Sequence, residues 1–194
     1  PPYRTYDPAV GAIGPFAPGL KENGGVFCHA HAWAIIAEAL LGRGDQAFAY
    51  YKMIAPTTRN RIAHVHATEG YVYAQFIAAP PHRQAGRARN SWLTGSATWN
   101  YVAMTQYLLG VRPTYDGLLI APCLPSAWDG FRMRRVFRGA TYDIRVRRNT
   151  RQPAGTVSLR VDGALQPSQV VPIFMDGGTH RVEVEMGDGV RGRR

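Results

Sequence analysis

The stretch that first indicates the fold class is Trp33-Ala34-Ile35-Ile36-Ala37-Glu38-Ala39-Leu40-Leu41-Gly42. Starting at Trp33, its apolar residues recur at i, i+3, i+4, i+7 and i+8, which is the pattern of one buried helix face. This predicted face comprises Trp33, Ile36, Ala37, Leu40 and Leu41. Gly42 fits the left-handed residue that ends such a helix. The sequence therefore predicts a helix that begins near Ala32 and ends at Gly42.

Similar patterns predict further helices along the first part of the chain. A second helix is expected from a cap at Asp45 to Ile54, and a third from a cap at Ser96 to Gly110. A shorter helix is expected over Tyr71–Ile77. Up to about residue 116 the chain is therefore predicted to be helical, with long polar, Gly-rich loops between the helices, and such loops are where sites are usually built.

Beyond residue 117 the apolar period changes from helical to two. Tyr142, Ile144 and Val146 alternate with polar residues, and the same alternation recurs over residues 157–161 and 182–186. Asp162-Gly163 and Asp176-Gly177-Gly178 are turn signals between such runs. The fold class is therefore predicted as α+β, with a helical domain over residues 1–116, an antiparallel β-sandwich over 117–187 and a disordered tail over 188–194.

Charge and composition limit the classes of partner. The chain of 194 residues carries a formal net charge of +10, but only Lys21 and Lys52 are lysines and the other basic residues are arginines. The densest basic run, 132–151, alternates with apolar residues, as on the solvated face of strands. We therefore expect no nucleic-acid partner. No apolar run approaches the roughly 20 residues that span a bilayer, so we expect no membrane segment.

The chain begins at Pro1 without an initiator Met, which we interpret as the start of a fragment of a longer chain. Its two cysteines, Cys28 and Cys123, are far apart and in apolar contexts. Two such residues make neither a disulfide framework nor a zinc signature. We expect reduced, buried thiols in a cytoplasmic protein.

The loop Asn90-Ser91-Trp92-Leu93-Thr94-Gly95-Ser96 runs directly into a predicted helix start. Backbone N–H groups at such a start favour an anion, Thr94 adds a hydroxyl donor, and Gly95 allows close approach of a ligand. The alternative is a plain helix cap with a glycine that the turn requires. His29 immediately precedes another predicted helix and is either a structural histidine or a second anion ligand.

Three other polar residues are candidates for contact with a sugar. Lys21 is either a surface cation or an anchor for a hydroxyl, and Glu22 is either a general base or a partner of Lys21. Gln75 can donate and accept at once, which suits vicinal hydroxyls, and the alternative is an ordinary amphipathic helix. Trp33, Trp92, Trp99, Phe16 and Phe27 are candidates for stacking on sugar or for the core. No isolated pair of acids indicates a glycosidase.

Several motifs of this chain together resemble those of glycoside hydrolase family 94, the cellobiose/chitobiose phosphorylase family, in the family's order. They are Lys21-Glu22-Asn23-Gly24-Gly25-Val26-Phe27-Cys28-His29, Tyr71-Val72-Tyr73-Ala74-Gln75, Asn90-Ser91-Trp92-Leu93-Thr94-Gly95, Pro122-Cys123-Leu124-Pro125 and Arg138-Gly139-Ala140-Thr141-Tyr142. The resemblance covers about residues 10–165. Several long motifs in order are far more specific than one short motif.

The resemblance implies the last part of an (α/α)6 barrel followed by a C-terminal β-sandwich. It also implies inverting phosphorolysis of a β-linked disaccharide or oligosaccharide to an α-sugar 1-phosphate, with phosphate as co-substrate and neither cofactor nor metal. By this resemblance His29, Thr94 and Gly95 bind phosphate, and Lys21 and Gln75 contact the sugar. The general acid belongs to an upstream motif that has no counterpart in this chain. The parent protein is expected to be a homodimer.

Two departures from the family leave the acceptor sugar open. The loop Ala12-Ile13-Gly14-Pro15-Phe16 is nearly apolar where relatives carry acceptor-specific residues, and Gly70 replaces an expected proline. The alternatives are a module at the end of a cyclic β-1,2-glucan synthase and a non-catalytic carbohydrate-binding module. A shared phosphate site requires the Cβ of His29 and the Cα of Gly95 to lie within about 12 Å of each other, the span of one phosphate and two hydrogen bonds. Helices that form only part of a barrel should also leave an apolar face exposed.

Overall fold

The computed structural model of the chain describes residues 2–189. These residues divide into two compact units, which we call the helical unit (2–38 and 46–103) and the β unit (39–45 and 104–189). The chain enters the β unit briefly at residues 39–45 and passes into it for the rest of its length between Ala103 and Met104. The predicted domain boundary lies slightly later, at residue 117.

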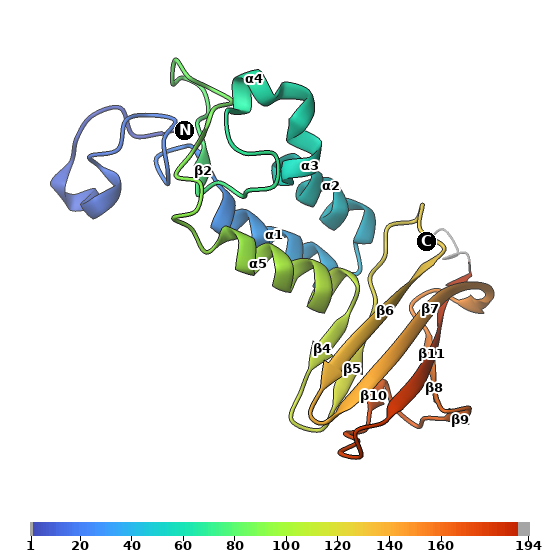
Figure 1. Cartoon of the computed structure of the whole chain (residues 1–194). Helices are drawn as coiled ribbons and strands as arrows, with labels where there is room; N and C mark the ends of the chain where they lie inside the picture. The colour runs from blue at the N-terminus through green and yellow to red at the C-terminus, as the bar shows by residue number, and fades with distance from the viewer. Residues whose placement is uncertain (1, 190–194) are drawn as a thin grey trace. The chain divides into compact units, whose positions relative to one another are not determined.

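The helical unit is built from five α-helices and three very short strands (Figure 1). The helices are α1 (Cys28–Leu40), α2 (Gly44–Ile54), α3 (Pro56–Arg59), α4 (Ala63–His66) and α5 (Ser96–Val102), with 3-10 helices at Pro8–Ile13 and Asn60–Ile62. The strands are β1 (Val26–Phe27), β2 (Phe76–Ile77) and β3 (Ala88–Arg89). Helix α5 continues into a π-helical segment, Ala103–Leu108. The segment that joins α1 to α2, residues 39–45, is grouped with the β unit.

Helix α1 forms where the sequence predicts it, but it buries a different face. The buried side chains are the small or compact Cys28, Ala32, Ile35 and Ala39. The predicted face is largely exposed, since Trp33, Leu40 and Leu41 have exposed fractions of 50%, 64% and 62%. The prediction of the face was wrong because the helix is apolar over most of its circumference, so periodicity does not determine which stripe packs inward. The expected exposed apolar face is confirmed by these three side chains.

The segment 71–77 is not the predicted helix. Residues 73–75 are irregular, and β2 follows, paired antiparallel with β1 on one side and with β3 on the other. The prediction was wrong because the run Tyr-Val-Tyr-Ala-Gln-Phe-Ile is rich in aromatic and β-branched residues, which fit a paired strand. From Gln75 onward its backbone hydrogen bonds go to the neighbouring strands and the residues next to them, while Val72 N still donates to the carbonyl of Glu69.

The predicted helix ends were partly right. Gly42 has φ of +72°, as expected for the left-handed residue after α1. Helix α2 starts at Gly44, and the carboxylate of Asp45 accepts hydrogen bonds from the N–H and the hydroxyl of Ser126 at 2.8 and 2.9 Å. Gly95, and not Ser96, occupies the cap position of α5. Both caps were mispredicted because each side chain has a competing role that the local sequence does not show.

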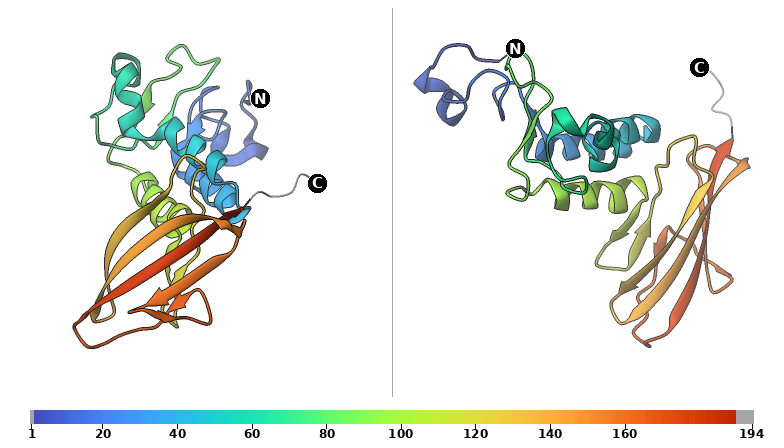
Figure 2. Two further views of the ribbon diagram at one scale, coloured as in Figure 1. Left: turned by 90° about the vertical axis from the view of Figure 1, so that its right-hand side faces the viewer. Right: turned by 45° about the horizontal axis from the view of Figure 1, so that its top comes forward.

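The β unit contains two sheets. The strands are β4 (Val111–Pro113), β5 (Leu118–Ile120), β6 (Gly130–Phe137), β7 (Ala140–Pro153), β8 (Val157–Val161), β9 (Ala164–Leu165), β10 (Val170–Val171) and β11 (Thr179–Gly189). One sheet has the order β10-β5-β4 and the other β6-β7-β11-β8-β9. Figure 2 shows the smaller sheet against one face of the larger one.

The predicted alternation in the β unit is confirmed. Tyr142, Ile144 and Val146 of β7 are buried in one core with Leu118 and Val171 of the smaller sheet. The prediction of a wholly antiparallel arrangement was wrong, because β11 pairs with β7 in parallel and with β8 antiparallel. Strands β7 and β8 run in opposite directions, so a strand inserted between them must be parallel to one of them. That insertion pairs residues far apart in the chain, so the alternation of apolar and polar residues along each strand does not reveal it.

The end of the β unit differs from the predicted tail. Residues 188 and 189, predicted to be disordered, belong to β11, and the rest of that tail, 190–194, lies outside the described residues. Across residues 2–189, no helix is both long and apolar enough to cross a bilayer.

Candidate functional site

The three short strands of the helical unit bring three separate loops together. Beyond the pairs Phe27↔Phe76 and Phe76↔Arg89, the next row of the sheet contains Cys28, Gln75 and Asn90. Backbone hydrogen bonds of this row run from Cys28 N to the carbonyl of Gln75 at 2.9 Å and from Gln75 N to the carbonyl of Asn90 at 3.3 Å. The loops before α1, before β2 and after β3 therefore meet at one edge of this small sheet.

His29, in the first turn of α1, is half-buried in an aromatic cluster. Its ring centroid lies 5.2 Å from that of Trp33, in an edge-to-face arrangement, and 5.9 Å from that of Trp99 on α5. The rings of Trp33 and Trp99 are themselves 5.7 Å apart. The ring of Phe27 lies parallel to that of His29 at 6.3 Å. These contacts restrict the imidazole to a narrow range of positions.

Gly95 lies directly against this imidazole. A Cβ atom built on Gly95 would lie 3.1 Å from Cε1 and 3.4 Å from Nδ1 of His29. The requirement that the two residues lie within about 12 Å is therefore met with a wide margin. The φ of Gly95 is −78°, so the glycine is needed for close approach and not for a left-handed backbone.

Thr94 is held beside Gly95 by the start of α5. Its hydroxyl oxygen accepts a hydrogen bond from the N–H of Ser96 at 3.0 Å and lies 2.7 Å from the hydroxyl of Ser96. This arrangement fixes the position of the Thr94 side chain. A hydroxyl, an imidazole and a glycine that leaves space for a ligand therefore lie on two adjacent helix starts.

Of the two predicted sugar contacts, Gln75 lies next to the backbone row that leads to His29, whereas Lys21 lies on a separate loop. The side-chain carbonyl of Gln75 accepts a hydrogen bond from the amide of Asn90 at 2.8 Å, next to the row that leads to His29. Lys21 lies on a tight loop with φ of +48°, and its ammonium is 4.7 Å from the centroid of the Phe16 ring. Among the described residues, Lys21 has no hydrogen bond to His29, Gln75 or Thr94.

Glu69, which the sequence did not assign, and Trp92, which it gave as a candidate for stacking on sugar or for the core, also contribute to this region. The carboxylate of Glu69 accepts a hydrogen bond from the indole N–H of Trp92 at 3.0 Å, and this bond lowers the pKa of Glu69. The Trp92 ring lies edge-to-face with that of Tyr71 at 6.2 Å, and its backbone has the unfavourable φ of +73°. Trp92 and Asn90 lie in the same motif as Thr94, which was the available signal. Their positive φ angles cannot be read from side-chain types.

Two other ionisable side chains of the helical unit, Cys28 and Tyr73, have raised pKa values. Burial raises the pKa of the Cys28 thiol to about 12, so it carries no thiolate at neutral pH. Burial and a hydrogen bond to Tyr51 raise the pKa of the Tyr73 hydroxyl. Within residues 2–189 there is no group of three His, Cys, Asp or Glu side chains that could hold a metal ion.

Comparison with known proteins shows that the sequence is similar to phosphorylases and to a glucan synthase. The chain is 39% identical over 186 residues to solabiose phosphorylase of Paenibacillus borealis, which covers 96% of this chain and 24% of the relative. It is 38% identical over 187 residues to N,N'-diacetylchitobiose phosphorylase of Vibrio proteolyticus, covering 96% of the chain and 23% of the relative. It is 35% identical over 162 residues to the cyclic beta-(1,2)-glucan synthase NdvB of Rhizobium meliloti, covering 82% of this chain and 6% of the relative.

The chain thus spans about a quarter of the length of the phosphorylases that it matches. The family model described as glycosyl hydrolase family 65, C-terminal domain, matches residues 111–182, which form most of the β unit. The family model described as glycosyl hydrolase 94 superfamily, catalytic domain, matches residues 1–110 and so contains every residue of the candidate site. The chain belongs to the glycosyl hydrolase 94 superfamily.

Proposed function

We propose that this chain is the C-terminal part of an inverting phosphorylase, which transfers a glycosyl group from a β-linked disaccharide such as cellobiose to inorganic phosphate. Its similarity to solabiose phosphorylase and N,N'-diacetylchitobiose phosphorylase supports this reaction class. In this proposal α1, α2 and α5 belong to the last part of an (α/α)6 barrel, and the β unit is the C-terminal β-sandwich. The parent enzyme is a cytoplasmic homodimer.

The observation that carries the proposal is the contact between His29 and Gly95 beside the Thr94 hydroxyl. A phosphate oxygen seated over Gly95 would accept hydrogen bonds from the imidazole and from Thr94. Hydrogen bonds to an ionised acceptor are shorter and stronger than neutral ones. The aromatic rings around His29 hold the imidazole in place before phosphate arrives, which reduces the cost of reorganisation during the reaction.

In the proposed reaction, a phosphate oxygen attacks the anomeric carbon from the face opposite the leaving sugar. A new C–O bond to phosphate forms, the glycosidic C–O bond breaks, and the leaving oxygen takes a proton from a carboxylic acid. We assign that acid to the part of the parent protein that precedes this chain, and assign Lys21 and Gln75 to contacts with the sugar. Phosphate is itself the nucleophile, so the reaction needs neither a metal nor a cofactor, and positioning carries the catalysis.

The test is the substitution Thr94→Ala in the full-length protein that contains this chain. Loss of one hydrogen bond to a charged group costs about 1.5–3 kcal/mol, so kcat/KM for phosphate should fall about tenfold or more. The kinetic terms for the disaccharide should change less. Thr98→Ala is the matched control, because Thr98 lies exposed in the first turn of α5. Equal effects of the two substitutions, or none from Thr94→Ala, would contradict the assignment.

A module of a cyclic β-1,2-glucan synthase is the second candidate, and the match to NdvB of Rhizobium meliloti favours it. The two candidates differ in the product of the parent protein, which is a sugar 1-phosphate for a phosphorylase and a cyclic glucan for a synthase. The chain alone should make no sugar 1-phosphate from cellobiose or chitobiose and phosphate. Detection of that product by phosphorus NMR would refute the upstream position of the acid.

A further inference from the structure

The outward face of the larger sheet in the β unit carries a cluster of arginines. Arg132 of β6 lies directly opposite Arg145 of β7, and Arg147 follows two positions along β7. Ile144 and Val146, which alternate with Arg145 and Arg147, are buried in the core, so these arginines point away from it. Three guanidinium groups thus share one small area of the sheet.

Like charges directly opposite each other on a sheet are destabilising unless something neutralises them. The nearest acids in register are Glu183 and Glu185 of β11, opposite Arg145 and Arg147. Both already have donors. Glu183 accepts from the guanidinium of Arg181 at 2.6 Å, and Glu185 accepts from the amides of Asn149 and Gln152 at 2.9 and 3.0 Å.

Within residues 2–189, Arg132, Arg145 and Arg147 form no side-chain hydrogen bond and no ion pair. Partial burial lowers the pKa of Arg145, the positive charges of Arg132, Arg147 and Arg181 lower it further, and the negative charge of Glu183 offsets part of this shift. The cluster is therefore an area of positive potential in which the guanidinium donors remain available to a ligand. An oxyanion, which an arginine can bind with two parallel hydrogen bonds, is the chemical group that fits them.

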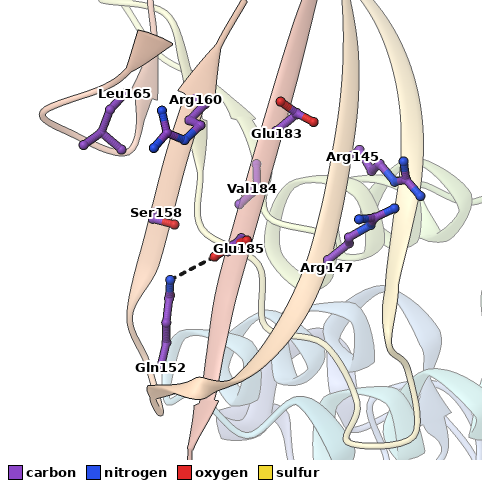
Figure 3. Close-up of a pocket in the computed structure, with 9 residues that line it drawn as sticks. All are labelled: Arg145, Arg147, Gln152, Ser158, Arg160, Leu165, Glu183, Val184 and Glu185. Atoms are coloured by element: carbon purple, nitrogen blue, oxygen red, sulfur yellow. Dashed lines mark hydrogen bonds between the residues drawn. The ribbon is translucent and has the colours of Figure 1, made fainter. Parts of the chain in front are cut away.

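A hollow of about 420 Å³ lies beside Arg145 and Arg147 (Figure 3). Arg145, Arg147 and Arg160 line it together with the hydroxyl of Ser158, and Figure 3 shows Glu183 and Glu185 between the two arginines of β7 and Ser158 of β8. Carboxylates accept hydrogen bonds from hydroxyl groups and repel free anions. The lining therefore favours a ligand that carries both hydroxyl groups and one oxyanion over an inorganic anion.

We infer that this hollow on the outer face of the β unit binds a sugar that carries one oxyanion group, either a phosphate or a carboxylate. The oxyanion would lie on Arg145 and Arg147, and the hydroxyl groups would donate to Glu183 and Glu185. The volume is within the range of small-molecule sites. This site uses none of the residues assigned to phosphorolysis, so it stands independently of the proposed function.

The test is calorimetric titration of the chain with α-glucose 1-phosphate, glucuronate, inorganic phosphate and glucose in a buffer of low ionic strength. The sugar phosphate, the sugar acid or both should bind with a Kd of about 1 mM, and inorganic phosphate and glucose should each bind more weakly. Arg145→Gln and Arg147→Gln should each raise the Kd about tenfold. Which of the two charged sugars binds identifies the oxyanion.

Two control variants distinguish binding in the hollow from a general effect of charge and from binding at the proposed phosphate site. Arg87→Gln removes the same charge from an exposed position in the helical unit and should leave the Kd unchanged. Thr94→Ala should also leave the Kd unchanged, because Thr94 belongs to the proposed phosphate site. Arg145→Gln relieves the repulsion between neighbouring arginines, so it should not lower the melting temperature of the chain. Ser158→Ala is a second variant of the lining, and it keeps every charge. Equal weakening by Arg87→Gln, or unchanged binding by Arg145→Gln and Arg147→Gln, overturns the inference.

Discussion

Substitution of Gly95 by alanine tests the proposed phosphate site through a single methyl group. The new Cβ would lie 3.1 Å from Cε1 and 3.4 Å from Nδ1 of His29, closer than ordinary van der Waals contact. The imidazole cannot easily withdraw, because Trp33 and Trp99 pack against it. We therefore expect the methyl group both to displace the imidazole and to occupy the space in which phosphate binds.

The expected loss follows from the proposed hydrogen bond between His29 and phosphate. That bond contributes about 1.5–3 kcal/mol, so kcat/KM for phosphate in the full-length protein should fall by about 10- to 150-fold. Folding should be affected little, because Gly95 is exposed and its φ of −78° and ψ of 1° are accessible to alanine. The loss of glycine at a helix cap should lower the free energy of unfolding by about 1 kcal/mol or less.

The assay is steady-state phosphorolysis with varied phosphate, together with thermal unfolding of the same preparation. Gly70→Ala is the matched control, since its Cβ would also lie 3.1 Å from a neighbour, but that neighbour is the mobile amide end of Asn60. Combining Gly95→Ala with His29→Asn should cost little more than either change alone. If Gly95→Ala keeps kcat/KM for phosphate within about threefold of the parent value, the imidazole does not bind phosphate at this position.

Three further predictions concern stability and reactivity. Tyr142→Phe removes a hydroxyl that donates to the carbonyl of Pro172 and accepts from the N–H of Phe174, so urea unfolding should show a loss of about 1–3 kcal/mol; an unchanged midpoint would contradict this. Iodoacetamide at pH 8 should label Cys28 only after denaturation, because its thiol is buried with a pKa of about 12; rapid labelling of the native chain, measured by mass spectrometry, would exclude that burial. Hydrogen bonds to Asp162 and Asp176 raise the pKa of His180 above about 6.5, and the bond with His180 lowers the pKa of Asp162 below about 3.8. A hydrogen bond from the N–H of Gly178 and, second, the bond with His180 lower the pKa of Asp176 below about 3.8. The stabilisation of the folded chain by the interaction of His180 with Asp162 and Asp176 should therefore be complete between about pH 4 and pH 6.5. It should decline as pH rises through the raised pKa of His180 or falls through the lowered pKa values of the aspartates. His180→Phe should abolish the decline in melting temperature on the alkaline side.

Alternation in the β unit predicted the fold correctly at the level of single strands. Each of the runs around Ile144, Leu159 and Val184 has one buried face, and a period of two leaves only one register that buries it. The order of the strands could not be predicted from the sequence, because β11 lies between β7 and β8 through pairings between residues far apart in the chain. Helix α1 shows the opposite case, in which the element was predicted correctly and its packed face was not. An apolar helix with small residues on one side and large ones on the other has two possible inner faces, and its neighbours decide between them.

The candidate site shows why residue types could be predicted when their geometry could not. His29, Gln75 and Thr94 are identifiable from motifs whose polar residues have few roles in a core. Their meeting depends on β1, β2 and β3, and strands of two residues are too short to show any period. The predicted helix over Tyr71–Ile77 would have separated Gln75 from Cys28, whereas the strand pairing joins them by a hydrogen bond of 2.9 Å. The irregular segment before β2 is thus the element on which the site depends, because it turns the backbone of Gln75 toward the start of α1 and its amide toward Asn90.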